Sequence, residues 1–103
     1  MIILSLDCAL KTGWCMWDSK AGKVVESGVQ DFSKQRGETN GLMFLRFRKW
    51  LHDLMGLQPV GLLAYEQAHH RGGAATEICV NLTGRVQEAA GLSGIECAAV
   101  RST

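Results

Sequence analysis

The sequence has no long apolar run, no excess of charge and no secretion signal. No stretch approaches the ~20 apolar residues that a bilayer span needs, and the N-terminus lacks a basic leader and a cleavage site. Eleven Lys and Arg against ten Asp and Glu give a formal net charge of +1, so any contact with nucleic acid must depend on a local basic patch. These absences predict a cytoplasmic protein with no membrane partner.

Cysteine motifs are also missing. The chain contains Cys8, Cys15, Cys79 and Cys97, but none of them forms a C-x-x-C pair and their spacing fits no zinc pattern. We therefore expect buried thiols in a reducing compartment rather than disulfides or a zinc site.

What the chain does contain is enough apolar residues for a core. Of its 103 residues, 47% are hydrophobic, which excludes a disordered chain and leaves room for one domain, residues 1–103.

Three strands are predicted near the N-terminus. The first is expected at residues 2–7, an almost unbroken apolar run that ends in Asp7. Apolar side chains on successive residues are typical of a strand that is buried on both faces. Two more strands at about 13–17 and 23–29, with a polar hairpin loop between them, would complete an antiparallel meander.

The second half alternates between helices and strands. Apolar residues at spacings of three and four predict helices at about 41–55 and 74–90. Between them, an apolar strand at 60–65 ends in Glu66, and a last strand is expected at 95–100. The order β-β-β-α-β-α-β predicts an α/β fold, with a five-stranded mixed sheet and helices on its faces.

Two carboxylates therefore end two apolar strands. A crossover helix returns the chain to the same direction, so the strands ending in Asp7 and Glu66 are expected to be parallel neighbours, ~4.8 Å apart. Two close carboxylates repel each other, and a divalent cation removes that repulsion. Oxygen ligands of this kind suit Mg²⁺ or Mn²⁺, and two such ions can clamp a phosphodiester. Each acid, taken alone, would equally fit a strand end that caps backbone amides.

Several of these segments resemble one known family. They are residues 3–7 (ILSLD), 10–14 (LKTGW) and 64–67 (AYEQ), followed by 74–76 (AAT) and 84–85 (GR). At this spacing they resemble the RuvC-type Holliday junction resolvases, in particular the phage and bacterial RuvC-like branch of the ribonuclease H-like superfamily. The resemblance implies a ribonuclease H-like fold.

The resemblance also implies a function. The family consists of metal-dependent endonucleases that cut branched DNA and leave 5′-phosphate and 3′-hydroxyl ends. Asp7 and Glu66 match its first two catalytic acids, which are metal ligands. The family works as a homodimer through the long helix after the second acid, which would place residues 74–90, with Gly84, at the dimer contact. Two active sites on a two-fold axis can cut symmetric strands of a four-way junction.

The chain departs from the family in three respects. Cys8 and Ala9 follow the first aspartate, where the family has proline and glycine. His69 and His70 stand where the family has a stacking aromatic residue. The family takes two further acids from a C-terminal helix, and residues 1–103 contain no such helix. We therefore expect the chain to be the N-terminal part of a longer domain, or else a degenerate relative, with weak metal binding and little or no cleavage.

Several basic residues near the two acids are candidates for DNA contacts, because they could hold phosphates or stack on a base. The histidines would equally fit a solvated loop. The DNA-binding candidates are Lys11, His69, His70, Arg71 and Arg85.

Two other functions remain open. Actin-like and sugar-kinase-like ATPases also begin with a strand, an acid and a glycine-containing turn. Ala9 disfavours this alternative, because such a turn requires glycine at that position. A non-catalytic DNA-binding or dimerisation module of the same fold would retain Asp7 and Glu66 only as relics.

Overall fold

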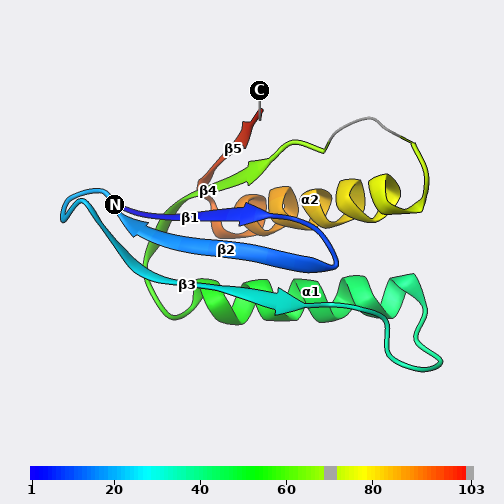
Figure 1. Ribbon diagram of the computed structural model, residues 1–103. Coiled ribbons are helices and arrows are strands. Elements are labelled where there is room, and N and C mark those ends of the chain that lie inside the picture. Colours follow the sequence, from blue (N-terminus) through cyan, green and yellow to red (C-terminus); the bar gives the residue numbers. More distant parts are fainter. Residues whose placement is uncertain (69–71, 102–103) are drawn as a thin grey trace.

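The computed structural model describes residues 1–68 and 72–101. Five strands and two helices follow one another in the predicted order (Figure 1). They are β1 (Ile2–Asp7), β2 (Lys11–Asp18), β3 (Lys23–Asp31), α1 (Asn40–Met55), β4 (Val60–Glu66), α2 (Ala74–Ser93) and β5 (Glu96–Val100).

The strands form one mixed sheet with the spatial order β3-β2-β1-β4-β5. The first three strands pair antiparallel, as the meander predicts, whereas β1 pairs parallel with β4 and β4 pairs parallel with β5. The predicted parallel pairing of the two acid-terminated strands is confirmed. This pairing brings Asp7 and Glu66 to the same end of the sheet.

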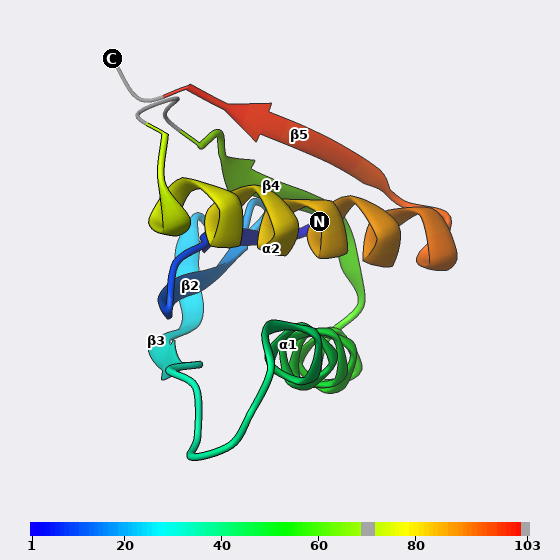
Figure 2. The ribbon, with the colours of Figure 1, turned by 90° about the vertical axis from the view of Figure 1, so that its right-hand side faces the viewer.

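Within the described residues, helices cover one face of the sheet. Figure 2 shows α1 and α2 on the same side of the strands, packed against each other. Leu4 and Leu6 point into that covered side and are buried, whereas Ser5 and Asp7 between and after them are exposed. The expectation that β1 is buried on both faces is therefore wrong. Its side chains alternate because, in the described part of the chain, no helix covers the second face.

The core lies between the covered face and the helices. Met43, Phe47, Leu51 and Leu54 form the buried stripe of α1, at the spacings of four and three that predict a helix. Phe32, just after β3, packs edge-on against Phe47 with ring centroids 5.1 Å apart. Trp50 closes this aromatic cluster at 5.2 Å from Phe32. The cluster ties the end of the meander to α1.

Some predicted boundaries differ from the observed ones. Strand β2 begins at Lys11 rather than at residue 13, because the turn after β1 is shorter than its polar sequence suggests. Helix α2 continues past Gly91 to Ser93 and ends at Gly94, whose φ of 66° is left-handed. Gly56 ends α1 in a right-handed conformation (φ −77°), so its freedom to adopt positive φ is not used. Neither described helix is long and apolar enough to span a bilayer.

Candidate metal centre

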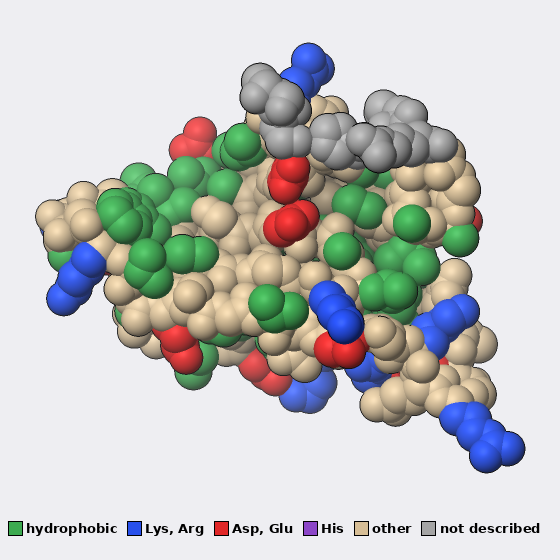
Figure 3. Space-filling model, viewed as in Figure 1, with side chains coloured by type: hydrophobic (Ala, Val, Ile, Leu, Met, Phe, Trp, Pro, Cys, Tyr) green, Lys and Arg blue, Asp and Glu red, His purple; other side chains and the backbone are tan. Residues whose placement is uncertain are grey.

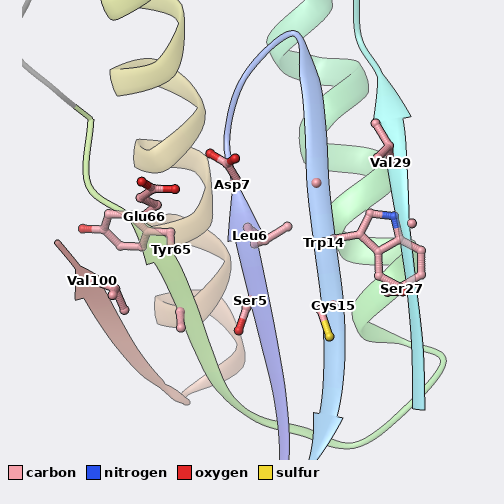
Figure 4. Close-up of a pocket in the computed structure, with 13 residues that line it drawn as sticks. Ser5, Leu6, Asp7, Trp14, Cys15, Ser27, Val29, Tyr65, Glu66 and Val100 are labelled. Carbon is pink, nitrogen blue, oxygen red and sulfur yellow. The ribbon is translucent and has the colours of Figure 1, made fainter. Parts of the chain in front are cut away.

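Asp7 and Glu66 lie side by side where β1 and β4 end. The parallel register pairs Leu6 with Tyr65, so the next residue of each strand is one of the two acids. Figure 4 shows both carboxyl groups at this end of the sheet, with α2 running behind them. Two neighbouring strands thus bring two carboxyl groups to the same end of the sheet.

The surroundings of Asp7 disfavour its charged form. Partial burial raises the pKa of Asp7, and the charge of Glu66 and a hydrogen bond between the two side chains raise it further. A divalent cation bound between the carboxylates would remove this repulsion. The raised pKa of Asp7 beside Glu66 therefore fits a cation site between the two carboxyl groups.

Two thiols border the carboxylates on the covered side. Burial raises the pKa of Cys8 to about 12, with smaller contributions from Cys79 and Asp7. Burial also raises the pKa of Cys79, on α2, and the charges of Asp7 and Glu66 add to that effect. Both thiols are therefore protonated and neutral at pH 7, and they are poor metal ligands in this state.

The turn between β1 and β2 is fixed by Thr12. Its hydroxyl donates to the carbonyl oxygen of Ala9 at 2.6 Å and accepts from the Ala9 amide at 3.4 Å. Thr12 is completely buried, although it lies in a polar segment, which is why the sequence gives no sign of this role. Gly13 lies directly opposite Asp7, and a Cβ at this position would make an ordinary van der Waals contact with Cβ of Asp7 at 3.9 Å.

A groove runs from the two acids across the sheet. Its volume is about 720 Å³, and its walls include Ser5, Cys15 and Ser27. The indole of Trp14 also lines it and lies against Gly28 of β3, at 3.1 Å from the position that a Cβ would take. Sequence inspection missed this pair, because a strand residue that rests on a glycine fourteen positions away leaves no local pattern.

The described residues supply an incomplete ligand set. Within residues 1–68 and 72–101, no group of three or more His, Cys, Asp or Glu side chains is placed to hold a metal ion. Asp7 and Glu66 suit Mg²⁺ or Mn²⁺ in charge and ligand type, but they fill only part of an octahedral shell.

The predicted DNA-binding residues have different surroundings. Lys11 is exposed at the start of β2, opposite Asp31 of β3. Arg85 lies beside Glu88, which also approaches Arg48 of α1, with nitrogen–oxygen distances of 3.6 and 3.5 Å. His69, His70 and Arg71 lie outside the described residues.

On the face shown in Figure 3, most Lys and Arg side chains lie toward the lower right, interspersed with acidic side chains, and others lie at the top and at the left edge. Acidic and apolar side chains occupy the centre of this face. This agrees with the nearly balanced charge of the sequence. None of the predicted DNA contacts is tested by the fold alone.

Comparison with solved structures identifies the architecture. The chain matches Thermus thermophilus RuvC in complex with a Holliday junction substrate with a TM-score of 0.81 and 14% sequence identity. The chain has the RuvC fold. This agreement covers 98% of the present chain and 64% of that RuvC chain. The ribonuclease H-like fold expected from the sequence is thereby confirmed.

Two further structures agree. Another T. thermophilus RuvC structure gives a TM-score of 0.74 at 16% identity, covering 98% of this chain and 64% of that one. The yeast mitochondrial Holliday junction resolvase gives 0.67 at 12% identity, covering 96% of this chain and 50% of that one. The present chain thus spans only half to two thirds of these RuvC-fold proteins. No protein-family model and no curated protein matches it.

Proposed function

We propose that this chain carries the first two acids of a metal-dependent endonuclease that acts on branched DNA. The observation that supports the proposal is the pair Asp7 and Glu66, which parallel strands of a RuvC fold bring together. Burial, and then the neighbouring Glu66, raise the pKa of Asp7. Adjacent carboxylates of this kind are suited to Mg²⁺ or Mn²⁺. The substrate class follows from the RuvC–Holliday junction complex whose fold the chain shares.

Each part of the site has a role in this proposal. Asp7 and Glu66 hold the cation, and a cation bound there stabilises negative charge on a phosphodiester during hydrolysis. Thr12 fixes the turn that follows Asp7, so that the carboxylate keeps its position beside Glu66. The buried thiol of Cys8 keeps the covered side of the site neutral and dry. The open face leaves room for the DNA strand.

Partner contacts complete the proposal. Lys11, Arg71 and Arg85, with His69 and His70, bind phosphates or bases near the cut. A second copy docks on α2, where a Cβ at Gly84 would meet no described atom within 4 Å. This open surface permits the close approach of another backbone. The two-fold symmetric pair would place two sites on one junction.

Metal binding by the purified chain tests the site directly. Titration with Mn²⁺, followed by electron paramagnetic resonance, should give an affinity that Asp7→Asn and Glu66→Gln each lower at least about tenfold. Glu96→Gln is the matched control. Glu96 is an exposed acid at the start of β5, whereas Glu66 lies beside Val100 at the end of that strand. Equal Mn²⁺ affinity in the wild type and all three variants would refute the proposed centre.

Binding without cleavage is the second candidate, and one observation favours it. The described residues offer two carboxylates and no third ligand, so the chain by itself is suited to hold branched DNA more than to cut it. A labelled four-way junction, tested for binding and for cleavage with and without Mg²⁺, separates the two functions. A binding module would retain full junction affinity after Asp7→Asn and would never produce nicks.

A further inference from the structure

Arg101 lies at the same end of the sheet as the two acids. It directly follows β5, and the last residue of that strand, Val100, is paired with Glu66 at the end of β4. Figure 4 shows Val100, Glu66 and Asp7 on the neighbouring strands β5, β4 and β1. Because these three strands are parallel, their carboxyl ends lie together, and this end of an α/β sheet is where ligands bind.

A continuation of the β4–β5 ladder holds the side chain of Arg101. The amide of Gln67, one residue beyond Glu66, donates to the carbonyl oxygen of Val100 at 2.8 Å. The Nε of Arg101 then donates to Oε1 of the Gln67 side chain at 3.2 Å. One backbone and one side-chain hydrogen bond therefore keep the guanidinium beside the residue that follows Glu66.

The guanidinium of Arg101 is suited to bind an anion. The bond to Gln67 uses the Nε–H, and the two terminal nitrogens carry the other four N–H donors, in a fork that matches two oxygens of a phosphate. The side chain is exposed, so a ligand can reach it. Within residues 1–68 and 72–101, Arg101 forms no ion pair. Its charge is therefore not cancelled by a described acid, and it leaves the Glu66 carboxylate to a cation.

A basic residue flanks the acids on each side. Along the spatial order β2-β1-β4-β5, the charged residues at this end are Lys11, Asp7, Glu66 and Arg101. Strand β2 is antiparallel to β1, which brings its first residue, Lys11, to this end. Lys11 lies opposite Asp31, whose charge offsets its own, whereas Arg101 is bonded to a neutral amide. Arg101 is therefore the stronger anion-binding position of the two.

We infer that Arg101 binds a phosphate of the DNA strand next to the phosphate that the cation contacts. The inference rests on the proposed function, because the cation held by Asp7 and Glu66 marks the position of the cut. Neighbouring strands of a sheet are ~4.8 Å apart, so the two contacts lie along the ends of β1, β4 and β5. Contact at two points fixes the line on which the DNA strand crosses the sheet. Gln67 acts through Arg101, as a positioning residue.

The salt dependence of junction binding tests this contact. A lost phosphate contact lowers the slope of log affinity against log salt concentration by about 0.9. For a labelled four-way junction at a fixed Mn²⁺ concentration, Arg101→Ala should lower that slope by this amount and lower the affinity about tenfold at low salt. Lys20→Ala is the matched control, because it removes the same charge from the β2–β3 turn, at the other end of the sheet. Equal slopes and affinities in the two variants would overturn the inference.

A double-mutant cycle tests the role of Gln67. Gln67→Ala should weaken junction binding several-fold in the wild-type background, because the guanidinium loses the bond that orients it. In the Arg101→Ala background the same substitution should have no further effect, since Gln67 acts only through that side chain. An equal loss in both backgrounds would contradict the proposed arrangement.

The Mn²⁺ titration without DNA separates this inference from the proposed metal centre. If Asp7→Asn lowers the Mn²⁺ affinity but Arg101→Ala keeps the wild-type salt slope, the metal centre stands and the phosphate contact is refuted. If Asp7→Asn leaves the Mn²⁺ affinity unchanged but Arg101→Ala lowers the slope, the metal centre is refuted and the phosphate contact stands. A wild-type chain that binds no junction would overturn the phosphate contact outright.

Discussion

Arg46 of α1 holds Glu38 of the preceding loop through two nitrogen–oxygen contacts of 2.6 and 2.7 Å. The same guanidinium donates to the carbonyl oxygens of Phe32 and Ser33 and lies 5.9 Å from the centre of the Phe32 ring. One side chain therefore connects the helix, the loop between β3 and α1, and the aromatic cluster of the core. No local pattern in the sequence reveals this role of Arg46, because all these partners lie eight or more positions away.

The first prediction concerns this contact. Arg46→Ala should lower the thermal unfolding midpoint by several degrees, because Glu38 and two carbonyl oxygens lose a donor that binds them together. Arg46→Lys should recover little, since an ammonium group cannot reproduce the forked geometry. Lys49→Ala is the control: Lys49 forms an exposed pair with Asp53 on the same helix, and its loss should change the midpoint by much less. Equal effects of Arg46→Ala and Lys49→Ala would contradict the role of Arg46.

The same pair predicts a pH dependence. The hydrogen bond from Arg46 lowers the pKa of Glu38 below its usual value. The carboxyl group of Glu38 therefore binds a proton less tightly in the folded chain than in the unfolded chain. The stabilisation that its contact with Arg46 provides is present above the unfolded pKa and is lost as the pH falls through the folded pKa. The difference in unfolding midpoint between wild type and Arg46→Ala should shrink between neutral pH and about pH 3. A constant difference over that range would show that the charge on Glu38 is not involved.

The second prediction uses the contact between Trp14 and Gly28. A Cβ at residue 28 would come within 3.1 Å of three atoms of the indole, which is too close for an ordinary carbon contact. Gly28→Ala should therefore push the indole aside, at a cost of about 1–3 kcal/mol in the free energy of unfolding. Urea denaturation measures that cost, and a shift in tryptophan emission reports the movement. Ser27→Ala, one residue away, is the control and should leave both the emission and the stability nearly unchanged.

How far the sequence predicts this fold can be judged from particular residues. The element order and the pairing of β1 with β4 follow from local periodicity and the handedness of crossover connections, and both are confirmed. The burial of Thr12 and the contact between Trp14 and Gly28 depend on packing between segments distant in sequence, which no local pattern records. Burial of β1 on both faces was wrong for a related reason. Apolar Ile3 resembles Leu4 in the sequence, and only the position of the helices distinguishes the two faces.

The third prediction concerns the proposed dimer helix. Alanine at an exposed position inside a helix is more favourable than glycine by ~1 kcal/mol, and Gly84 of α2 has open space beside it in the described structure. In a monomer, Gly84→Ala should therefore raise the free energy of unfolding by up to ~1 kcal/mol. In a dimer that brings two α2 backbones together at Gly84, the added methyl group should weaken association instead. Chemical denaturation at low and high protein concentration distinguishes the two results, because only the second depends on concentration.

The last prediction concerns the repulsion between Asp7 and Glu66. Burial and the neighbouring carboxylate raise the pKa of Asp7, so the folded chain binds this proton more tightly than the unfolded chain. The stabilisation by this proton is complete below the unfolded pKa and is lost as the pH rises through the folded pKa. At pH 7 without metal, Asp7→Asn should therefore raise the unfolding midpoint, and at pH 3 the midpoints of variant and wild type should converge. Saturating Mn²⁺ should reverse the order of the two unfolding midpoints at pH 7, because only the wild-type pair gains stability by binding the ion.

Thermal unfolding at the two pH values, with and without Mn²⁺ at pH 7 and with Glu96→Gln as control, provides the test. A variant that is less stable than wild type at pH 7 without metal would show that Asp7 supports the fold rather than straining it, and the main physical argument for a cation at this end of the sheet would then be lost.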